Sequence, residues 1–294
     1  MASSNLRYQG KVTIVTGGTQ GIGEGVVREF VKAGAKVIFC GREVADGEKL
    51  EKEMNDKGPG EACLIKCDVT KEEDIKNLVE KTVEKYGWID CLINNAGWHP
   101  PSKTIDQTSA HEFRDLLNLN LMNYFLFCKF ALPHLRKTKG NIINMSSLVA
   151  QIGQPGAVAY VASKGAVTSM TKALAIDEAK CGVRVNSISP SNVWTPLWEY
   201  VAQLSGDFEK SKKDGEECQL SGRMGTLEEC GQACLYLAAE ATFTTGTDLL
   251  LTGGAELTYG KKTQVKNEDN QNYFISWVSV RAVFKQLSSF ILSG

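Results

Sequence analysis

The sequence predicts an α/β fold, a doubly wound parallel sheet of seven strands with helices on both faces, as a single domain over residues 1–260. Short apolar runs rich in β-branched residues alternate with helical patterns, which is typical of a parallel sheet that is buried on both faces. Polar and glycine-rich motifs directly follow several of these runs, where doubly wound sheets bind their ligands. No strong linker interrupts residues 10–255, so a single domain is expected there.

The predicted strands are short apolar runs. The first, "KVTIVTG", ends at Gly17, and the helix that follows it is closed by Gly34. Strands are predicted over residues 11–17, 36–40, 62–67, 90–95, 141–147, 183–189 and 248–254. Helices are predicted over residues 22–32, 45–57 and 71–86, and two longer helical regions flank the strand at 141–147. Right-handed crossovers between these strands produce the doubly wound arrangement.

Composition and charge argue against several function classes. The 294 residues carry a formal net charge of −1 without a basic stripe, so no nucleic-acid partner is expected. Nine scattered cysteines without a C-x-x-C pair indicate reduced thiols in a cytoplasmic protein. With only three histidines and no clustering, no metal site is expected. The first residues lack the apolar segment of a signal peptide, and no apolar run is long enough to span a bilayer.

A glycine-rich turn separates the first strand from the first helix, between Thr16 and Gly23. Glycine allows a tight turn and a close approach of the backbone to a pyrophosphate, which binds at the positive end of the helix. In this position the turn predicts a Rossmann-type dinucleotide site rather than a generic loop. The cofactor-binding residues expected in the turn are Gly17, Gln20, Gly21, Ile22 and Gly23.

Tyr160 and Lys164 form a Y-x-x-x-K pattern, in which positions i and i+4 share one face of a helix. Free tyrosine has a pKa of ~10, which is too high for a general base at neutral pH. A nearby ammonium and a positive nicotinamide favour the phenolate. Tyr160 could then take the proton of an alcohol while hydride leaves carbon for the nicotinamide. Because the pattern also occurs by chance on ordinary helices, its setting decides its meaning.

The setting resembles the short-chain dehydrogenase/reductase superfamily over about residues 10–255. The matching motifs, in order, are T-G-x-x-x-G-x-G from Thr16, Asp68-Val69-Thr70, N-N-A-G from Asn94 and Y-x-x-x-K. The resemblance implies a catalytic set made of Asn120, Ser147, Tyr160 and Lys164. It also implies that Ser147 orients the substrate oxygen, that Asn120 supports a proton relay and that Lys164 holds the nicotinamide ribose. Ser146 and Asn118 are the nearby competitors of Ser147 and Asn120.

The resemblance implies further cofactor contacts, from Asp68, Val69, Asn95, Ala96, Gly97, Pro190, Val193 and Thr195. Two stretches depart from the family pattern. Ser191 follows Pro190 where a glycine is usual, and a positive φ there would cost energy. Gly41 and Arg42 end the second strand, where an acidic residue would bind the adenosine ribose of NAD. Arg42 could instead pair with the 2′-phosphate of NADP, so NAD and NADP both remain open.

The substrate side is expected to be apolar and aromatic. The segment 194–218 is predicted to be a mobile substrate-binding region, and a hydrophobic alcohol suits its large side chains. The substrate-binding candidates are Trp98, His99, Ser147, Tyr160, Trp194, Leu197 and Trp198. The resemblance implies oxidation of a secondary alcohol, either the 17β-hydroxyl of a steroid or the anomeric hydroxyl of L-fucose, by a homotetramer. The alternative is a dinucleotide-binding sensor or scaffold without catalysis.

The resemblance stops near residue 261, and a polar linker follows it. Trp277, Val280, Phe284, Leu287 and Ile291 then recur at helical spacing, which predicts an amphipathic helix of ~15 residues. The tail at 261–294 could pack on its own domain or a partner subunit, lie on a membrane surface, or be poorly ordered.

Overall fold

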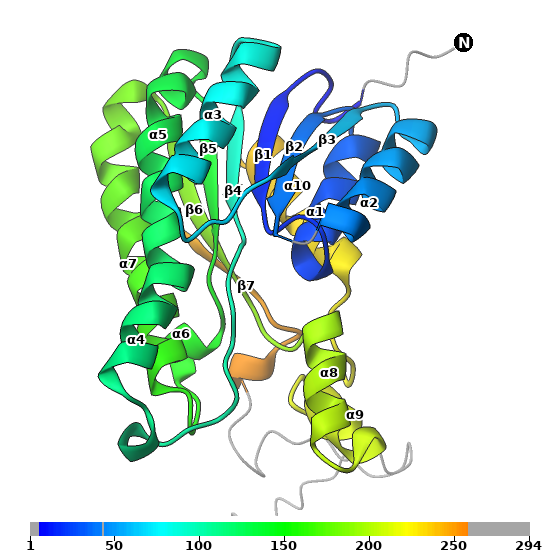
Figure 1. The fold of residues 1–294 in the computed structure, drawn as a ribbon, viewed down its shortest axis with the longest axis vertical. Helices are drawn as coiled ribbons and strands as arrows, with labels where there is room; N and C mark the ends of the chain where they lie inside the picture. The colour runs from blue at the N-terminus through cyan, green and yellow to red at the C-terminus, as the bar shows by residue number, and fades with distance from the viewer. Residues whose placement is uncertain (1–5, 43, 258–294) are drawn as a thin grey trace, which may run out of the picture. The chain divides into compact units, whose positions relative to one another are not determined.

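The computed structural model describes residues 6–42 and 44–257, and these form a parallel sheet of seven strands in the order β3-β2-β1-β4-β5-β6-β7 (Figure 1). The strands are β1 Val12–Thr16, β2 Lys36–Gly41, β3 Glu61–Lys66, β4 Cys91–Asn94, β5 Asn141–Met145, β6 Arg184–Pro190 and β7 Asp248–Leu251. The order reverses beside β1, which pairs with β2 on one side and with β4 on the other. The predicted fold class is therefore confirmed.

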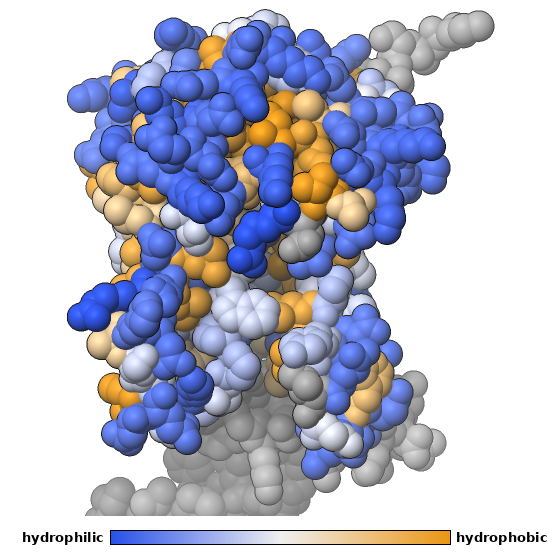
Figure 2. Space-filling model, viewed as in Figure 1, coloured by the Kyte–Doolittle hydropathy of each residue, from blue (hydrophilic) through white to orange (hydrophobic). Residues whose placement is uncertain are grey.

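Helices cover both faces of the sheet. Their bounds are α1 Gly21–Lys32, α2 Val44–Lys57, α3 Glu72–Tyr86, α4 Ala110–Leu117, α5 Asn123–Thr138, α6 Val149–Ile152, α7 Val158–Glu178, α8 Pro196–Leu204, α9 Phe208–Glu217 and α10 Leu227–Ala239. Apolar residues of α1, α2 and α10 form one core with the sheet, and those of α3, α5 and α7 form the other (Figure 1). Alternate strand residues enter each core because successive side chains point to opposite faces. Hydrophilic residues cover much of the surface in the same view, and hydrophobic residues are exposed mainly in its middle (Figure 2).

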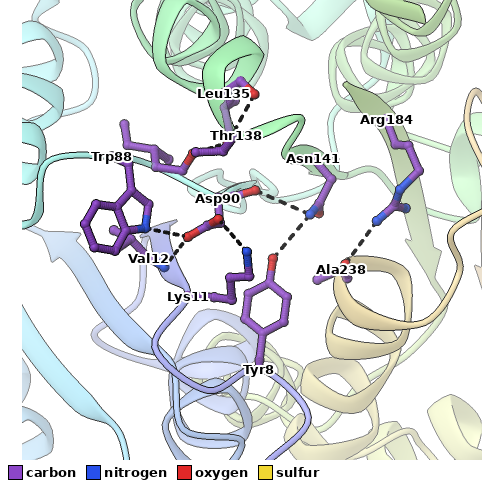
Figure 3. Close-up of polar contacts among 11 residues, drawn as sticks. Tyr8, Lys11, Val12, Trp88, Asp90, Leu135, Thr138, Asn141, Arg184 and Ala238 are labelled. Carbon is purple, nitrogen blue, oxygen red and sulfur yellow. Dashed lines mark hydrogen bonds and ion pairs between the residues drawn. The ribbon is translucent and has the colours of Figure 1, made fainter. Parts of the chain in front are cut away.

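The edge formed by the amino ends of the strands is closed by a polar network around Asp90 (Figure 3). The buried carboxylate accepts hydrogen bonds from the Val12 amide at 2.8 Å, the Trp88 indole at 2.9 Å and the Lys11 ammonium at 3.0 Å. Asn141 donates to the Tyr8 hydroxyl at 3.3 Å in the same region. A buried charge is tolerated when it is paired in this way. The predicted cofactor and catalytic residues lie at the opposite edge of the sheet, at the carboxyl ends of the strands.

The boundaries of the predicted elements agree with the structure to within a few residues. The segment 194–218, expected as one substrate-binding region, contains the two short helices α8 and α9. Within residues 6–42 and 44–257, no helix combines the length and the apolar character needed to cross a membrane. The predictions for residues 261–294 lie outside the described residues.

Candidate active site

The glycine turn after β1 is shaped by backbone crowding. Gly17 has a φ of +63°, a conformation that glycine adopts without steric cost. A Cβ atom on Gly23 would collide with the Gly17 carbonyl oxygen and lie 2.6 Å from Nδ2 of Asn95. The α1 helix begins directly after this turn, with Gln20 at its N-cap position. The open cradle at a helix N-terminus suits the pyrophosphate of a dinucleotide.

Asn95, predicted from the N-N-A-G motif, braces this turn from the neighbouring strand. Its Nδ2 donates to the carbonyl oxygens of Thr16 at 3.0 Å and of Gly17 at 3.1 Å. In return, Oγ1 of Thr16 accepts from the amides of Asn95 at 2.9 Å and of Ala96 at 3.0 Å. Thr16 opens the T-G-x-x-x-G-x-G motif, but the motif does not reveal that its hydroxyl accepts these two bonds, because they come from a segment about 80 positions later in the chain.

Gly41 ends β2 close to the glycine turn. A Cβ atom at this position would lie 2.7 Å from both Oγ1 and Cγ2 of Thr19. Thr19 therefore takes up the space that a larger residue at position 41 would need. The neighbouring Arg42 is exposed, and Glu43 lies outside the described residues.

Asp68 follows β3 at the same edge. Its carboxylate accepts from the hydroxyl of Thr70 at 2.7 Å and from the Thr70 amide at 3.1 Å, and these bonds lower the pKa of Asp68. Val69, beside it, is buried. Asp68 thus stays charged at neutral pH, next to the carboxyl ends of β2 and β3.

The loop after β6 carries the remaining predicted cofactor residues. Pro190 ends the strand, and Val193 is buried beside Gly225. Thr195 caps α8, with its hydroxyl accepting from the Trp198 amide at 3.1 Å, and its Cγ2 lies 3.8 Å from the position of a Cβ atom on Gly21. Ser191 does not adopt a positive φ, because Lys139 is the one non-glycine residue in the described part of the chain that does. The strain considered for Ser191 is therefore absent, and its hydroxyl donates to the Thr252 carbonyl at 2.9 Å.

The four predicted catalytic residues come from the loop after β5, from α7 and from a π-helical turn. Tyr160 and Lys164 are on α7, and Ser147 follows β5. The Ser147 hydroxyl is hydrogen-bonded to Tyr160, while Ser146 is buried and donates to the Lys164 carbonyl at 3.0 Å. Of the two serines, it is thus Ser147 that meets the phenol.

Burial perturbs both ionisable groups of this pair. It raises the pKa of Tyr160, an effect opposed by the hydrogen bond with Ser147. Burial also lowers the pKa of Lys164 to about 7. The Lys164 ammonium lies 5.9 Å from the centre of the Tyr160 ring. A lysine that titrates near neutral pH beside a phenol is typical of proton-transfer sites.

Asn120 lies in the π-helical turn Asn118–Met122, which interrupts the helices α4 and α5. Its Oδ1 accepts from the Trp98 amide at 2.8 Å, and its Nδ2 donates to the Trp98 carbonyl at 2.9 Å. A Cβ atom on Gly97 would lie 3.1 Å from Asn120 Oδ1 and 3.5 Å from Lys164 Nζ. Asn120 is buried next to the lysine, whereas its competitor Asn118 is exposed. Such π-turns are frequent at functional sites.

Aromatic residues surround Tyr160, although not all in the predicted way. The His99 ring lies 4.2 Å from the Tyr160 ring, between centroids. Trp98 and Tyr160 line a cavity of about 390 Å³, together with Pro100, Leu116, Leu119 and Val158 among others. Trp194 contacts Trp198, with ring centroids 6.0 Å apart, and the Trp198 indole fills the space beside Gly215 of α9. Leu197 is partly buried on α8. The substrate contacts of Trp194, Leu197 and Trp198 stay predictions.

The structure offers little for a metal ion. Among the residues that the structure describes, no group of three or more His, Cys, Asp or Glu side chains could hold one.

Comparison with known proteins places the chain in a family. A family model described as enoyl-(acyl carrier protein) reductase matches residues 17–256. L-fucose dehydrogenase from Bos taurus is 55% identical over 256 residues, which cover 87% of this chain and 93% of that protein. The Mus musculus L-fucose dehydrogenase is 53% identical over 87% of this chain and 92% of its own length. The stretches "NNAGWHPP" and "NVWTPLWE" resemble an enzyme known both as 17β-hydroxysteroid dehydrogenase type 14 and as L-fucose dehydrogenase. The identity to L-fucose dehydrogenases confirms that resemblance.

Solved structures of sugar dehydrogenases and reductases share the fold. The ligand-free aldohexose dehydrogenase of Thermoplasma acidophilum superimposes with a TM-score of 0.79 at 32% identity, over 90% of this chain and 100% of that one. The L-sorbose reductase of Gluconobacter frateurii, complexed with NADPH and L-sorbose, gives 0.82 at 26% identity over 87% and 100%. The chain is therefore an NAD(P)-dependent oxidoreductase that belongs to the short-chain dehydrogenase/reductase superfamily.

Proposed function

We propose that this oxidoreductase oxidises L-fucose at its anomeric hydroxyl and also accepts the 17β-hydroxyl of estradiol-like steroids. The observation that carries the proposal is the grouping of Tyr160, Ser147 and Lys164 in a chain 55% identical to an L-fucose dehydrogenase. The aromatic residues near Tyr160 suit either substrate, because aromatic rings pack on steroids and stack on sugar faces.

The proposed mechanism assigns one task to each residue. Ser147 donates a hydrogen bond to the substrate oxygen and orients it. Tyr160, as phenolate, takes the hydroxyl proton, while Lys164 supplies the positive charge that favours that phenolate. Asn120 supports the return of this proton to solvent. The glycine turn and Asn95 fit a dinucleotide, which when bound supplies a nicotinamide ring as hydride acceptor. The alcohol thereby loses one hydride and one proton and becomes a carbonyl.

The test is kcat/KM for L-fucose and for estradiol on one preparation, together with Tyr160→Phe. Tyr160→Phe is expected to lose at least about 100-fold in kcat, the low end of what a positioned acid–base contributes. Near-normal kcat in Tyr160→Phe would refute the mechanism, and no turnover of either substrate by the unaltered chain would remove the substrate assignment. A non-catalytic dinucleotide sensor, the alternative class, would bind NAD or NADP with both substrates untouched.

We also propose that discrimination against NADP is weakened. At the end of β2, Gly41 offers no carboxylate to repel a 2′-phosphate, and the exposed Arg42 supplies a guanidinium that can pair with one. The closeness of Thr19 to Gly41 is consistent with the proposal, because an acidic side chain at position 41 would require Thr19 to move. The ratio of kcat/KM with NADP to that with NAD measures this, and a strong preference for NAD would refute it.

A homotetramer in the cytoplasm is the proposed state of the protein. Exposed apolar side chains offer two candidate surfaces: Met122, Phe125 and Ile176 beside α5 and α7, and Tyr236, Phe243 and Leu250 near α10 and β7. Exposed apolar side chains mark interfaces where they adjoin one another in a large patch. All nine cysteines are free thiols, as a reducing compartment would keep them. Light scattering after size-exclusion chromatography tests the assembly, and a monomeric mass would refute it.

A further inference from the structure

A second phenol lies beside the catalytic lysine, on a different helix. Tyr124 is in the first turn of α5, four residues after Asn120, and its side chain is completely buried. Its hydroxyl donates to the Met145 carbonyl at 3.1 Å and lies 3.5 Å from Lys164 Nζ. Its contact with the proposed catalytic lysine points to a part in the reaction.

The three groups form a closed hydrogen-bonded triangle. Lys164 Nζ donates to the Met145 carbonyl at 2.8 Å and to the Tyr124 hydroxyl, and that hydroxyl donates to the same carbonyl. The ammonium also lies 5.3 Å from the centre of the Tyr124 ring. Since Met145 is the last residue of β5, the triangle ties the lysine to the strand that leads into Ser147.

The triangle opposes the effect of burial on the lysine. Burial lowers the pKa of Lys164 to about 7, whereas an oxygen lone pair and the face of an aromatic ring both favour the charged ammonium. Burial also raises the pKa of Tyr124, so Tyr124 stays a neutral phenol. Among the described residues packed on the ammonium, the titratable groups are Tyr124 from α5 and Tyr160 from its own helix. The end of β5 and the loop after β4 contribute only uncharged groups there, the Met145 carbonyl and Gly97.

We propose that Tyr124 is a positioning residue, whose hydroxyl keeps Lys164 charged beside Tyr160. The proposal rests on the proposed roles of Tyr160 and Lys164. Tyr124 itself contacts neither the substrate nor the hydride-transferring atoms, and it acts only through the lysine.

This role predicts a specific change in the pH dependence of kcat. After the Tyr160–Lys164 pair has lost one proton, it exists in two forms with the same number of protons. The active form is a Tyr160 phenolate with a charged Lys164, and the inactive form is a neutral phenol with a neutral amine. Loss of the Tyr124 hydroxyl favours the form in which Tyr160 and Lys164 are both neutral. The fraction of enzyme in the active form therefore falls at pH values where the pair has lost its first proton. At acidic pH, Tyr160 and Lys164 are both protonated in the unaltered enzyme and in a variant without the Tyr124 hydroxyl. The rate then depends on the pKa of Tyr160 beside a charged lysine, and loss of the Tyr124 hydroxyl leaves that pKa unchanged.

The experiment is the pH dependence of kcat for alcohol oxidation by Tyr124→Phe, with saturating cofactor. We expect the variant to match the unaltered enzyme at the acidic end and to reach a plateau about threefold lower. The apparent pKa of the acidic limb should fall by about half a unit. A larger share of the neutral pair lowers the plateau and this apparent pKa by the same factor. Tyr8→Phe is the matched control, because it removes another buried tyrosine hydroxyl at the opposite edge of the sheet (Figure 3) and should leave the profile unchanged.

A purely structural role for Tyr124 predicts a different profile. Misplacement of Lys164 would lower kcat equally at every pH, and either that result or an unchanged profile would overturn the proposal. Tyr124→Met also lacks the hydroxyl and must show the same convergence at acidic pH, which keeps the test valid if Tyr124→Phe folds poorly. Either negative result leaves the proposed function intact, whereas an active Tyr160→Phe would remove both.

Discussion

Substitutions at the end of β2 test the proposed use of NADP most directly. Arg42→Ala removes the exposed guanidinium that could pair with a 2′-phosphate. A hydrogen bond to a charged group contributes about 1.5–3 kcal/mol, and the exposure of Arg42 places it at the low end of that range. We therefore expect kcat/KM with NADP to fall about tenfold, since about 1.4 kcal/mol is one factor of ten. The value with NAD should stay the same.

The reverse change needs two substitutions. Gly41→Asp would supply the carboxylate that binds ribose hydroxyls and repels a phosphate, but its Cβ would lie 2.7 Å from two atoms of Thr19. Thr19→Gly removes those atoms, so the double variant can hold the new side chain without displacing the glycine turn. We expect the NADP-to-NAD ratio of the double variant to fall by about tenfold or more.

Initial rates with each cofactor, at a fixed saturating alcohol concentration, provide the assay. Thr19→Gly alone is the matched control, because it opens the space without adding a charge. If Arg42→Ala lowers kcat/KM equally with both cofactors, Arg42 does not recognise the phosphate and the reasoning is wrong. A double variant with the same cofactor ratio as Thr19→Gly would contradict the role assigned to position 41.

Three further predictions concern the framework of the site and its stability. Gly23→Ala should abolish cofactor binding in a fluorescence titration, because its methyl group collides with the Gly17 carbonyl; retained affinity would contradict this. Lys139→Gly should stabilise the chain by about 1 kcal/mol, since it removes a φ of +52° from a non-glycine residue, and an unchanged or lower Tm would contradict it. Arg136→Met should destabilise the chain at pH 7, because two hydrogen bonds of 2.6 and 2.8 Å to the buried Glu178 are lost. These bonds lower the pKa of Glu178 in the folded state, so they stabilise above its unfolded pKa of about 4.3. The difference in urea-unfolding free energy from the unaltered chain should shrink as pH falls through the folded pKa, and a constant difference would show that the charge is not responsible.

The fold was predictable because its signals are local. Runs such as "KVTIVTG" and "DCLINN" combine β-branched or apolar residues with a polar or glycine end, and the structure contains a strand in each. The handedness of crossovers then predicts helices on both faces, whereas the strand order itself was not predicted. The π-helical turn at Asn118–Met122 was not predictable, because its residues continue the helical pattern on either side.

For the candidate site, sequence motifs predict residues but do not predict their contacts. Motifs select Tyr160, Lys164 and Asn95, yet only packing shows that Thr19 fills the space beside Gly41. Tyr124 gave no signal either, since a tyrosine in an apolar helix is most simply read as core. Its meaning depends on Lys164, which is 40 positions away in the chain.

The hydrogen bonds of Asn95 have a consequence for the order of folding. The carbonyls that Asn95 holds in the glycine turn lie 79 and 78 positions before it. The glycine turn is therefore held in shape only after β4 has docked beside β1. Such a long loop closure is entropically costly and comes late. A nascent chain that ends before β4 would thus have no completed glycine turn, and a dinucleotide could stabilise the chain only after β4 has joined β1.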